Sequence, residues 1–278
     1  MEGNNSYLAC VVKVLKKYLY EVIVLLSIIF IICMVYFVKG RVGGFAWAAA
    51  IFVLGPLGAF LFLAQLVILI IRCFMKKKTR IVHMAASLLL AFPITILVGL
   101  IFIPYPDNAN VSDAITLSVP VKGEAVLLGG KDYKTHAVWP SERYAYDILE
   151  QPYDTGNSDL QSYGIYGKEV YAPIKGEIIE VHDGEVDIAP NVEKFTSLLG
   201  NYIYMRVEKT GTYLIFAHLK PDSISVKVGD IVEVGTVIAQ VGNSGTTSEP
   251  HLHLQHQKNN PCQSTIAIAE EGLPITFK

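Results

Sequence analysis

The stretch VGNSGTTSEPHLHLQ, residues 241–255, places two histidines one residue apart after a glycine-rich turn and a proline. Residues two apart in a β-strand share one face, so His251 and His253 are expected to point the same way, with Leu252 and Leu254 packing on the opposite side. Two imidazoles on one face suit one metal ligand and one neighbouring acid–base group. Taken alone, the pair is explained equally well by two solvated histidines.

Two upstream segments supply further groups of the same kind. His218 lies near the end of the apolar run YLIFAHL, residues 213–219, and Asp147 lies within RYAYDI, residues 143–148. A catalytic zinc site takes three protein ligands from histidine and carboxylate groups and leaves one position open for water. Together with the histidine pair, these segments indicate a catalytic zinc site.

The sequence around these groups is typical of β-structure. From residue 118 onward, short β-like runs alternate with Gly, Asn and Asp, which predicts an all-β domain with antiparallel pairing. Two stretches, 150–166 and 183–200, are too long for tight turns, and loops of this length are usually either functional or disordered. Strands are expected at 119–128, 144–149, 169–172, 176–182, 201–208, 212–217, 224–228, 237–241 and 251–256.

These motifs, in this order, resemble the lysostaphin-type, or LytM-like, zinc peptidases, a family of peptidoglycan endopeptidases. The resemblance implies an antiparallel sheet of the LytM, or barrel-sandwich hybrid, type and hydrolysis of peptide bonds by zinc-activated water. It covers about residues 120–256. The segments that carry it are 167–173, 176–178, 200–203, 217–219, 228–230, 235, 238, 241–245 and 250–253.

The resemblance also implies roles for four of the residues named above. Asp147 and His253 would be ligands of one Zn²⁺ in the catalytic domain. His251 and His218 would be the two non-ligand histidines, with His251 as general base and His218 as oxyanion stabiliser or proton relay, although the sequence does not fix which histidine has which role.

The third zinc ligand is where this chain departs from the family pattern. The family commonly places it four residues before the aspartate, where this chain has Arg143, an always protonated side chain that cannot ligate a metal. The nearest upstream histidine is His136, eleven residues before Asp147. Family members with a similar Arg-Tyr-Ala-aromatic-Asp segment carry their histidine at this longer spacing, so we expect His136 to be the third ligand. The alternative is His182 as a replacement ligand, but we expect His182 to be a surface residue at the end of a strand.

The preceding part of the chain has a different character. Residues 1–103 carry a net charge of +8 and residues 104–278 a net charge of −10. Three apolar runs, 18–38, 45–71 and 81–103, are long enough for transmembrane helices, and the second contains Gly55 and Pro56, which indicate a tilt or kink. The predicted organisation is a membrane domain (1–103), an extracytoplasmic tether (104–118) and a LytM-like metallopeptidase domain (119–278).

Charge in the short loops predicts the orientation of these helices. Lys and Arg residues in short loops collect on the cytoplasmic side of a membrane. Eight of them lie either before the first run or in the loop between the second and third runs, whereas the loop between the first and second runs has two. The N-terminus is therefore expected inside and, after three spans, the catalytic domain outside. The expected partners are the lipid bilayer and peptidoglycan peptides, with no nucleic acid; a protein activator is left open.

A second interpretation is a metal-free LytM-like domain that binds the wall or activates a partner hydrolase without cleaving. A third is a structural anchor tethered to the wall. At least four of the five expected site groups are present, which favours the enzyme, and the zinc content of the protein would discriminate between the first two.

Overall fold

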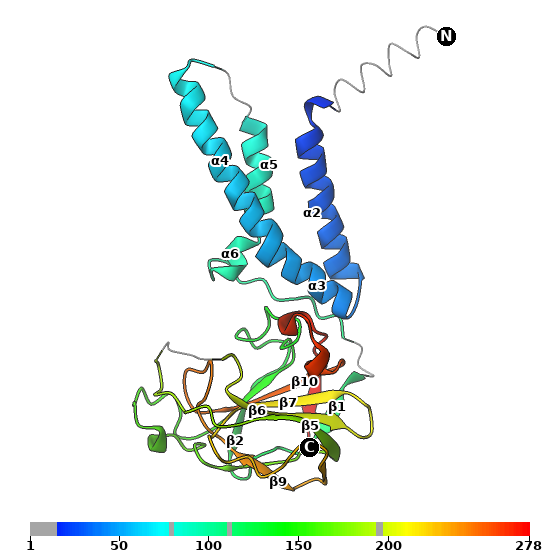
Figure 1. Cartoon of the computed structure of the whole chain (residues 1–278), viewed down its shortest axis with the longest axis vertical. Helices are drawn as coiled ribbons and strands as arrows, with labels where there is room; N and C mark the ends of the chain where they lie inside the picture. Colours follow the sequence, from blue (N-terminus) through cyan, green and yellow to red (C-terminus); the bar gives the residue numbers. More distant parts are fainter. Residues whose placement is uncertain (1–15, 78–80, 110–112, 193–196) are drawn as a thin grey trace, which may run out of the picture. The chain divides into compact units, whose positions relative to one another are not determined.

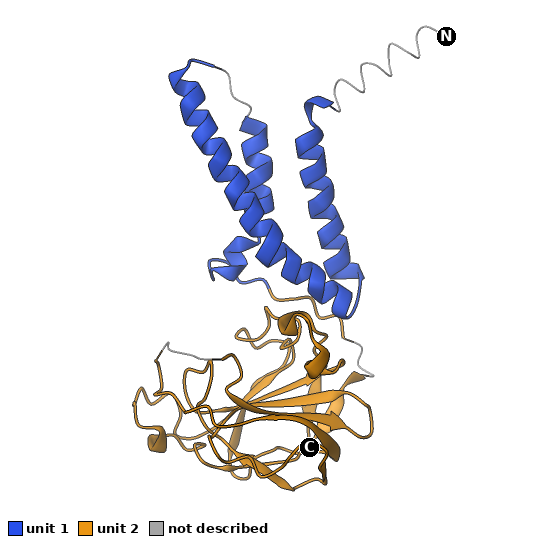
Figure 2. Cartoon of the chain, viewed as in Figure 1, with its two compact units in different colours: residues 1–103 blue, residues 104–278 orange. Residues whose placement is uncertain are grey.

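The computed structural model describes residues 16–77, 81–109, 113–192 and 197–278. The chain divides into two compact units, residues 1–103 and 104–278 (Figures 1 and 2). The first unit is helical and the second is built of β-strands.

Within the described residues, two helices of the first unit are long and apolar enough to cross a membrane. One is α2 (Leu19–Phe37). The other runs unbroken from Arg41 to Phe74 through α3 (Arg41–Ala49), the π-helical segment η1 (Ala50–Leu54) and α4 (Gly55–Phe74). The π segment lies directly before Gly55 and Pro56, which agrees with the expected irregularity, because a proline removes one backbone donor and disturbs the preceding turn.

The third apolar run does not form one long helix. It gives α5 (Ile81–Ala91), about 17 Å long at 1.5 Å per residue, and a short α6 (Ile94–Leu97). Pro93 stands at the break between them. A bilayer core is about 30 Å thick, so α5 alone is too short to cross it. Of the three predicted transmembrane helices, two are present with sufficient length. A third span over 81–103 remains a prediction.

The helices of the first unit pack through small and polar contacts. A Cβ added to Gly58 of α4 would lie 2.3 Å from the backbone nitrogen of Ala91, so only glycine permits the close approach of α4 to α5. His83 of α5 lies 2.8 Å from the carboxylate of Glu21 on α2.

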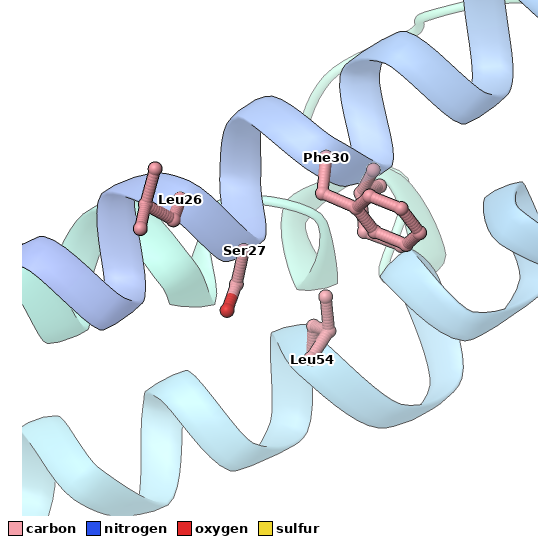
Figure 3. Close-up of a pocket in the computed structure, with 5 residues that line it drawn as sticks. Leu26, Ser27, Phe30 and Leu54 are labelled. Atoms are coloured by element: carbon pink, nitrogen blue, oxygen red, sulfur yellow. The ribbon is translucent and has the colours of Figure 1, made fainter.

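A cavity of about 390 Å³ lies between α2 and η1 (Figure 3). Its only hydroxyl group, that of Ser27, donates a hydrogen bond to the carbonyl oxygen of Ile23 at 2.9 Å. The remaining lining side chains are apolar, so the cavity offers no group for chemistry: Leu26, Phe30, Ile31 and Leu54.

The second unit contains a seven-stranded antiparallel sheet in the order β2-β3-β10-β7-β6-β5-β8. Two small sheets accompany it: a parallel pair of β1 (Ile115–Leu117) with β11 (Ile275–Phe277), and an antiparallel pair of β4 (Glu169–Tyr171) with β9 (Val237–Gln240). The strands of the large sheet are β2 (Ala125–Gly129), β3 (Tyr146–Glu150), β10 (Leu252–Gln257), β7 (Tyr213–Leu219), β6 (Asn201–Val207), β5 (Gly176–His182) and β8 (Ile231–Val232).

Strand alternation separates the core from the candidate site. Ile148, Leu252 and Phe216 are fully buried in the main hydrophobic core. Their neighbours Asp147 and His253 therefore lie on the opposite face, where they stand directly across from each other on β3 and β10. The predicted antiparallel β-domain is confirmed, and its central strands carry the site.

The segment predicted as a tether, 104–118, is in part folded onto the second unit. Tyr105 is buried and its backbone N–H donates to the carbonyl oxygen of Ala137 at 2.7 Å. Ile115 and Leu117 are buried in the core, and β1 pairs with β11. The apolar side chains in this otherwise polar stretch explain the difference; residues 110–112 lie outside the described part.

Candidate metal centre

Asp147 stands at the middle of a cluster of imidazoles. On the adjacent strand, His253 Nδ1 lies 3.2 Å from Asp147 Oδ1. His251, directly before β10, places its Nε2 3.5 Å from the same oxygen. All three side chains are buried, and the strand register brings His253 and Asp147 together.

A loop between β2 and β3 delivers the fourth group, His136. Successive backbone hydrogen bonds, from Ala137 to Tyr133 (3.1 Å) and from Trp139 to His136 (2.9 Å), wind this loop into turns. His136 Nε2 then reaches within 2.9 Å of Asp147 Oδ1. Residues 137–142 thus make the excursion that an eleven-residue spacing requires.

His136, Asp147 and His253 offer ligand atoms that all lie within 4.8 Å of one another. Two imidazole nitrogens and one carboxylate oxygen suit zinc, whose bonds of roughly 2.0–2.2 Å place tetrahedral ligands about 3.4 Å apart. The observed separations of 2.9 and 3.2 Å from the carboxylate oxygen are close to that value. The residues present therefore fit a zinc ion.

The electrostatics of this group favour an ionised carboxylate. Burial opposes ionisation of Asp147, but the charge of His251 and hydrogen bonds from His136 and His253 keep its pKa well below the usual value. Burial also lowers the pKa of His136, yet hydrogen bonds to Asp147 and Glu142 outweigh it and raise that pKa to about 10. A metal ion must therefore displace a proton from His136, as is general for histidine ligands.

His251 and His218 form the other side of the cluster, with ring centroids 4.8 Å apart. Each has its Nδ1 against a backbone carbonyl oxygen at 2.8 Å, that of Glu249 for His251 and that of Ser244 for His218. A carbonyl oxygen only accepts, so Nδ1 carries a proton in both rings, and the neutral form of either ring has its lone pair on Nε2. Burial first, and then the neighbouring histidines, hold the pKa of His218 well below its usual value, so this ring is neutral.

The backbone around His218 is held in an unusual conformation. Its φ is +61°, in the left-handed region, and its backbone N–H donates to the carbonyl oxygen of Leu199 at 2.9 Å. The Ser244 carbonyl oxygen reaches His218 because Gly200 and Gly245 approach closely. A Cβ on Gly245, whose φ is +76°, would lie 2.2 Å from the nitrogen of Gly200. Strain of this kind is often found at functional sites.

Arg143, at the position where the family commonly has a ligand, faces away from the metal group. It is buried, and its Nε donates to the carbonyl oxygen of Tyr105 at 2.7 Å while Nη1 donates to that of Lys131. The guanidinium group thus ties the His136 loop to the segment that precedes β1.

Residues 161–264 match the family model for Peptidase family M23. The chain carries a peptidase family M23 domain. This confirms the resemblance drawn from the motifs of the β-domain. The matched residues include His218, His251 and His253, whereas His136 and Asp147 lie before them.

Solved structures also resemble this chain in part. One is a protein assigned to peptidase M23 from Pseudomonas aeruginosa, 19% identical over 57% of this chain and 47% of that chain, with a TM-score of 0.34. Another is the catalytic domain of the antimicrobial peptidase lysostaphin from Staphylococcus simulans. It is 22% identical over 49% of this chain and 81% of that chain, with a TM-score of 0.32. A third is a zinc-containing peptidase from Vibrio cholerae. It is 20% identical over 53% of this chain and 34% of that chain, with a TM-score of 0.29. This chain thus spans about half of the Pseudomonas protein and about a third of the Vibrio protein.

All the residues expected at the site of the M23 domain lie in one cluster: His136, Asp147, His218, His251 and His253. His182, the rejected alternative ligand, is exposed and stacks on Tyr202 with ring centroids 5.4 Å apart. His256 lies on the opposite strand face and bonds to Thr212 and Pro274.

The groups that hold the histidines of the M23 domain were not predicted from the sequence. Glu142 accepts from His136, and the carbonyl oxygens of Ser244 and Glu249 fix the tautomers of His218 and His251. A carboxylate six residues after an expected histidine ligand was a usable signal for Glu142. Backbone carbonyl oxygens leave no trace in a sequence.

Proposed function

We propose that this chain is a membrane-anchored, zinc-dependent endopeptidase that hydrolyses peptide bonds in cell-wall peptidoglycan. The observation that carries the proposal is the convergence of His136, Asp147 and His253 beside two further histidines on one face of the sheet. Two imidazoles and a carboxylate are a donor set that catalytic zinc sites use. The M23 match over the neighbouring residues supports the same chemistry.

The proposed ligand atoms are His136 Nε2, His253 Nδ1 and a carboxylate oxygen of Asp147. When bound there, zinc would supply Lewis-acid activation of water and of the scissile carbonyl group. The protein's own part is to bring three ligands from a loop and two strands and to surround them with buried side chains, so that the reacting groups are shielded from bulk water.

His251 is proposed as the general base. Its Nδ1–H is committed to the carbonyl oxygen of Glu249, and its Nε2 faces Asp147 Oδ1 at 3.5 Å, which places the lone pair on the side of the metal group. Nε2 can therefore take a proton from the attacking water and return it to the leaving amine.

His218 is proposed as a proton relay. Its Nδ1–H is held by Ser244, and its neutral Nε2 carries no proton to donate to an oxyanion. Of the two roles expected for this histidine, the tautomer therefore favours relay with His251, whose ring lies next to it.

The substrate is proposed to lie across the strands on the face that carries the metal group. His253 pairs with Ala217 on β7, and the rings of Tyr202 on β6 and His182 on β5 continue along the same face. At about 4.8 Å per strand, β6 and β5 lie roughly 10 and 14 Å from β10, or three to four residues of an extended peptide. Residues 150–166 and 183–200 would wall this groove; of these, residues 193–196 lie outside the described part of the chain. The backbone N–H of Asp154 donates to the Glu249 carboxylate at 2.6 Å.

The proposed location is the cell membrane, with a cytoplasmic N-terminus and the M23 domain outside. Two helices have the length and composition of membrane spans, and the eight-to-two charge asymmetry of the loops favours this orientation. The placement of the M23 domain outside depends on a third crossing by residues 81–103.

A domain that binds the wall or activates a partner hydrolase without cleaving is the second candidate, because Arg143 occupies the family's common ligand position. The test uses the full chain, purified in detergent, with defined muropeptides. We expect mass spectrometry to show cleavage at a peptide bond, lost on chelation and restored by zinc. Binding of the muropeptides by the zinc-loaded chain without any cleavage would favour the second candidate.

A further inference from the structure

We propose that Glu142 is a positioning residue for the metal ligand His136. Its carboxylate accepts the Nδ1–H of His136 and so presents Nε2 to the metal. This inference rests on the proposed function, because it concerns the metal site of the same enzyme.

The contacts of the His136 ring define the two sides of the imidazole. Nδ1 lies 3.1 Å from Glu142 Oε2, and Nε2 lies 2.9 Å from Asp147 Oδ1. An imidazole presents a lone pair on only one nitrogen, and the hydrogen bond made by the other decides which one. The ring is buried, with 9% of its side chain exposed, so water competes little for Nδ1.

Glu142 is itself held by the loop that carries His136. Its backbone N–H donates to the carbonyl oxygen of Trp139 at 3.2 Å, and its carbonyl oxygen accepts from Ala145 at 2.8 Å. One loop thus supplies both the ligand and the group that orients it.

The other histidine ligand lacks a partner of this kind. His253 turns Nδ1 toward Asp147, and its Nε2 lies 3.5 Å from the amide oxygen of Gln255, which is long for a hydrogen bond. His136 comes from a loop and His253 from a central strand. The ligand on the less constrained element is therefore the one that receives a charged hydrogen-bond acceptor.

Charge balance supports the same assignment. Asp147 and Glu142 together carry two negative charges, which match a divalent cation. The next residue, Arg143, is turned away and donates to the carbonyl oxygens of Tyr105 and Lys131. A carboxylate bound to the outer nitrogen of a histidine ligand fixes the ring and raises its basicity.

The test measures zinc affinity by competition with a chromophoric chelator, using the full chain in detergent. We expect E142Q to weaken zinc binding roughly 10- to 100-fold, and E142A to weaken it further because glutamine still offers a neutral acceptor. The matched control is E180Q, since Glu180 accepts a hydrogen bond from the hydroxyl group of Tyr202 at 2.8 Å on another part of the sheet. Its zinc affinity should equal that of the wild type.

A second readout separates positioning from general damage. The visible spectrum of the cobalt-substituted E142Q chain should change relative to wild type, while the thermal unfolding of the metal-free E142Q chain stays the same. Zinc affinity of E142Q within twofold of wild type, or equal losses in E142Q and E180Q, would overturn the inference. A wild-type chain that binds no zinc would instead overturn the proposed function on which it rests.

Discussion

His251 and His253 occur in one short motif, yet they present different nitrogens to Asp147. His253 offers Nδ1 and has its other nitrogen near an amide, whereas His251 offers Nε2 and has its Nδ1 bound to a backbone carbonyl oxygen. Side-chain alternation in a strand predicts that the two rings share a face. It does not predict which ring is nearer to a metal, because that depends on ring rotation and on the chain before the strand.

Replacing His251 by alanine is expected to leave zinc bound while hydrolysis falls. The three proposed ligands remain, and loss of a positioned general base typically costs about 10²–10⁴-fold in rate. The measurement is metal content alongside the rate of muropeptide cleavage. Loss of zinc together with activity would show that His251 is a ligand and reverse the roles within the pair.

His256 makes the stability of the M23 domain sensitive to acid. Burial lowers its pKa to about 4, and its two ring nitrogens lie near the carbonyl oxygen of Pro274 (3.3 Å) and the hydroxyl group of Thr212 (2.7 Å). In the unfolded chain a histidine titrates near 6.5, so protons bind the unfolded state preferentially between these values. Stability should therefore fall as pH drops from about 6.5 to about 4, by about 3 kcal/mol in total.

The check is chemical unfolding of wild type and H256Q at pH 7 and pH 4.5. The wild type should lose more free energy of unfolding between the two pH values than the variant. Equal losses would show that another group is responsible for the acid sensitivity.

Among elements, the central strands follow from the sequence better than the edges. Residues 176–182 were expected as a strand and form β5, whereas β1, β8 and β11, each of two or three residues, were not expected. The strand expected at 224–228 is absent; Ser225 makes a backbone hydrogen bond to Ile238, but no ladder forms. Long strands carry a buried periodic pattern, while short ones depend on distant partners that a local pattern does not contain.

The His136 loop shows the same limit at the site. The exclusion of arginine as a ligand and the longer spacing implied by the family resemblance together point to His136. The hydrogen bonds of Arg143 to Tyr105 and Lys131 join segments far apart in the chain, and nothing local to Arg143 indicates them. The place of His136 beside Asp147 could be predicted from the sequence, whereas the hydrogen bonds that support its loop could not.

Replacing Gly245 by alanine should disturb the turn that sets the Ser244 carbonyl oxygen against His218. The added Cβ would lie 2.2 Å from the nitrogen of Gly200, so the backbone must shift. The matched control is G229A: Gly229 has φ +92°, yet an added Cβ there meets nothing within 4 Å. Both variants carry backbone strain of about 1–3 kcal/mol, and only G245A should also lose activity. Similar activity in the two variants would contradict this role for the turn.

For the molecule as a whole, the side of the membrane on which the M23 domain lies depends on the number of crossings. Two helices of sufficient length are present, and α5 alone is too short to span. With the N-terminus inside, a third crossing by residues 81–103 places the domain outside, whereas its absence would leave the domain inside.

Protease treatment of intact protoplasts tests this topology. We expect residues 119–278 to be degraded, and a reporter fused after Lys278 to be active only if it functions outside the cell. The charge asymmetry of the loops is the physical reason, because Lys and Arg are retained on the cytoplasmic side. Complete protection of residues 119–278, with degradation after the cells are opened, would place the domain inside.

The central claim is that a loop histidine completes a zinc site with Asp147 and His253. The most direct measurement is the metal content of the wild-type, H136A and H182A chains, purified in parallel and exposed to zinc. The predicted result is one zinc ion per chain in the wild type and in H182A, and loss of the metal in H136A, because two ligands hold zinc poorly. Full zinc occupancy of H136A, or a wild-type chain without bound zinc, would contradict the claim.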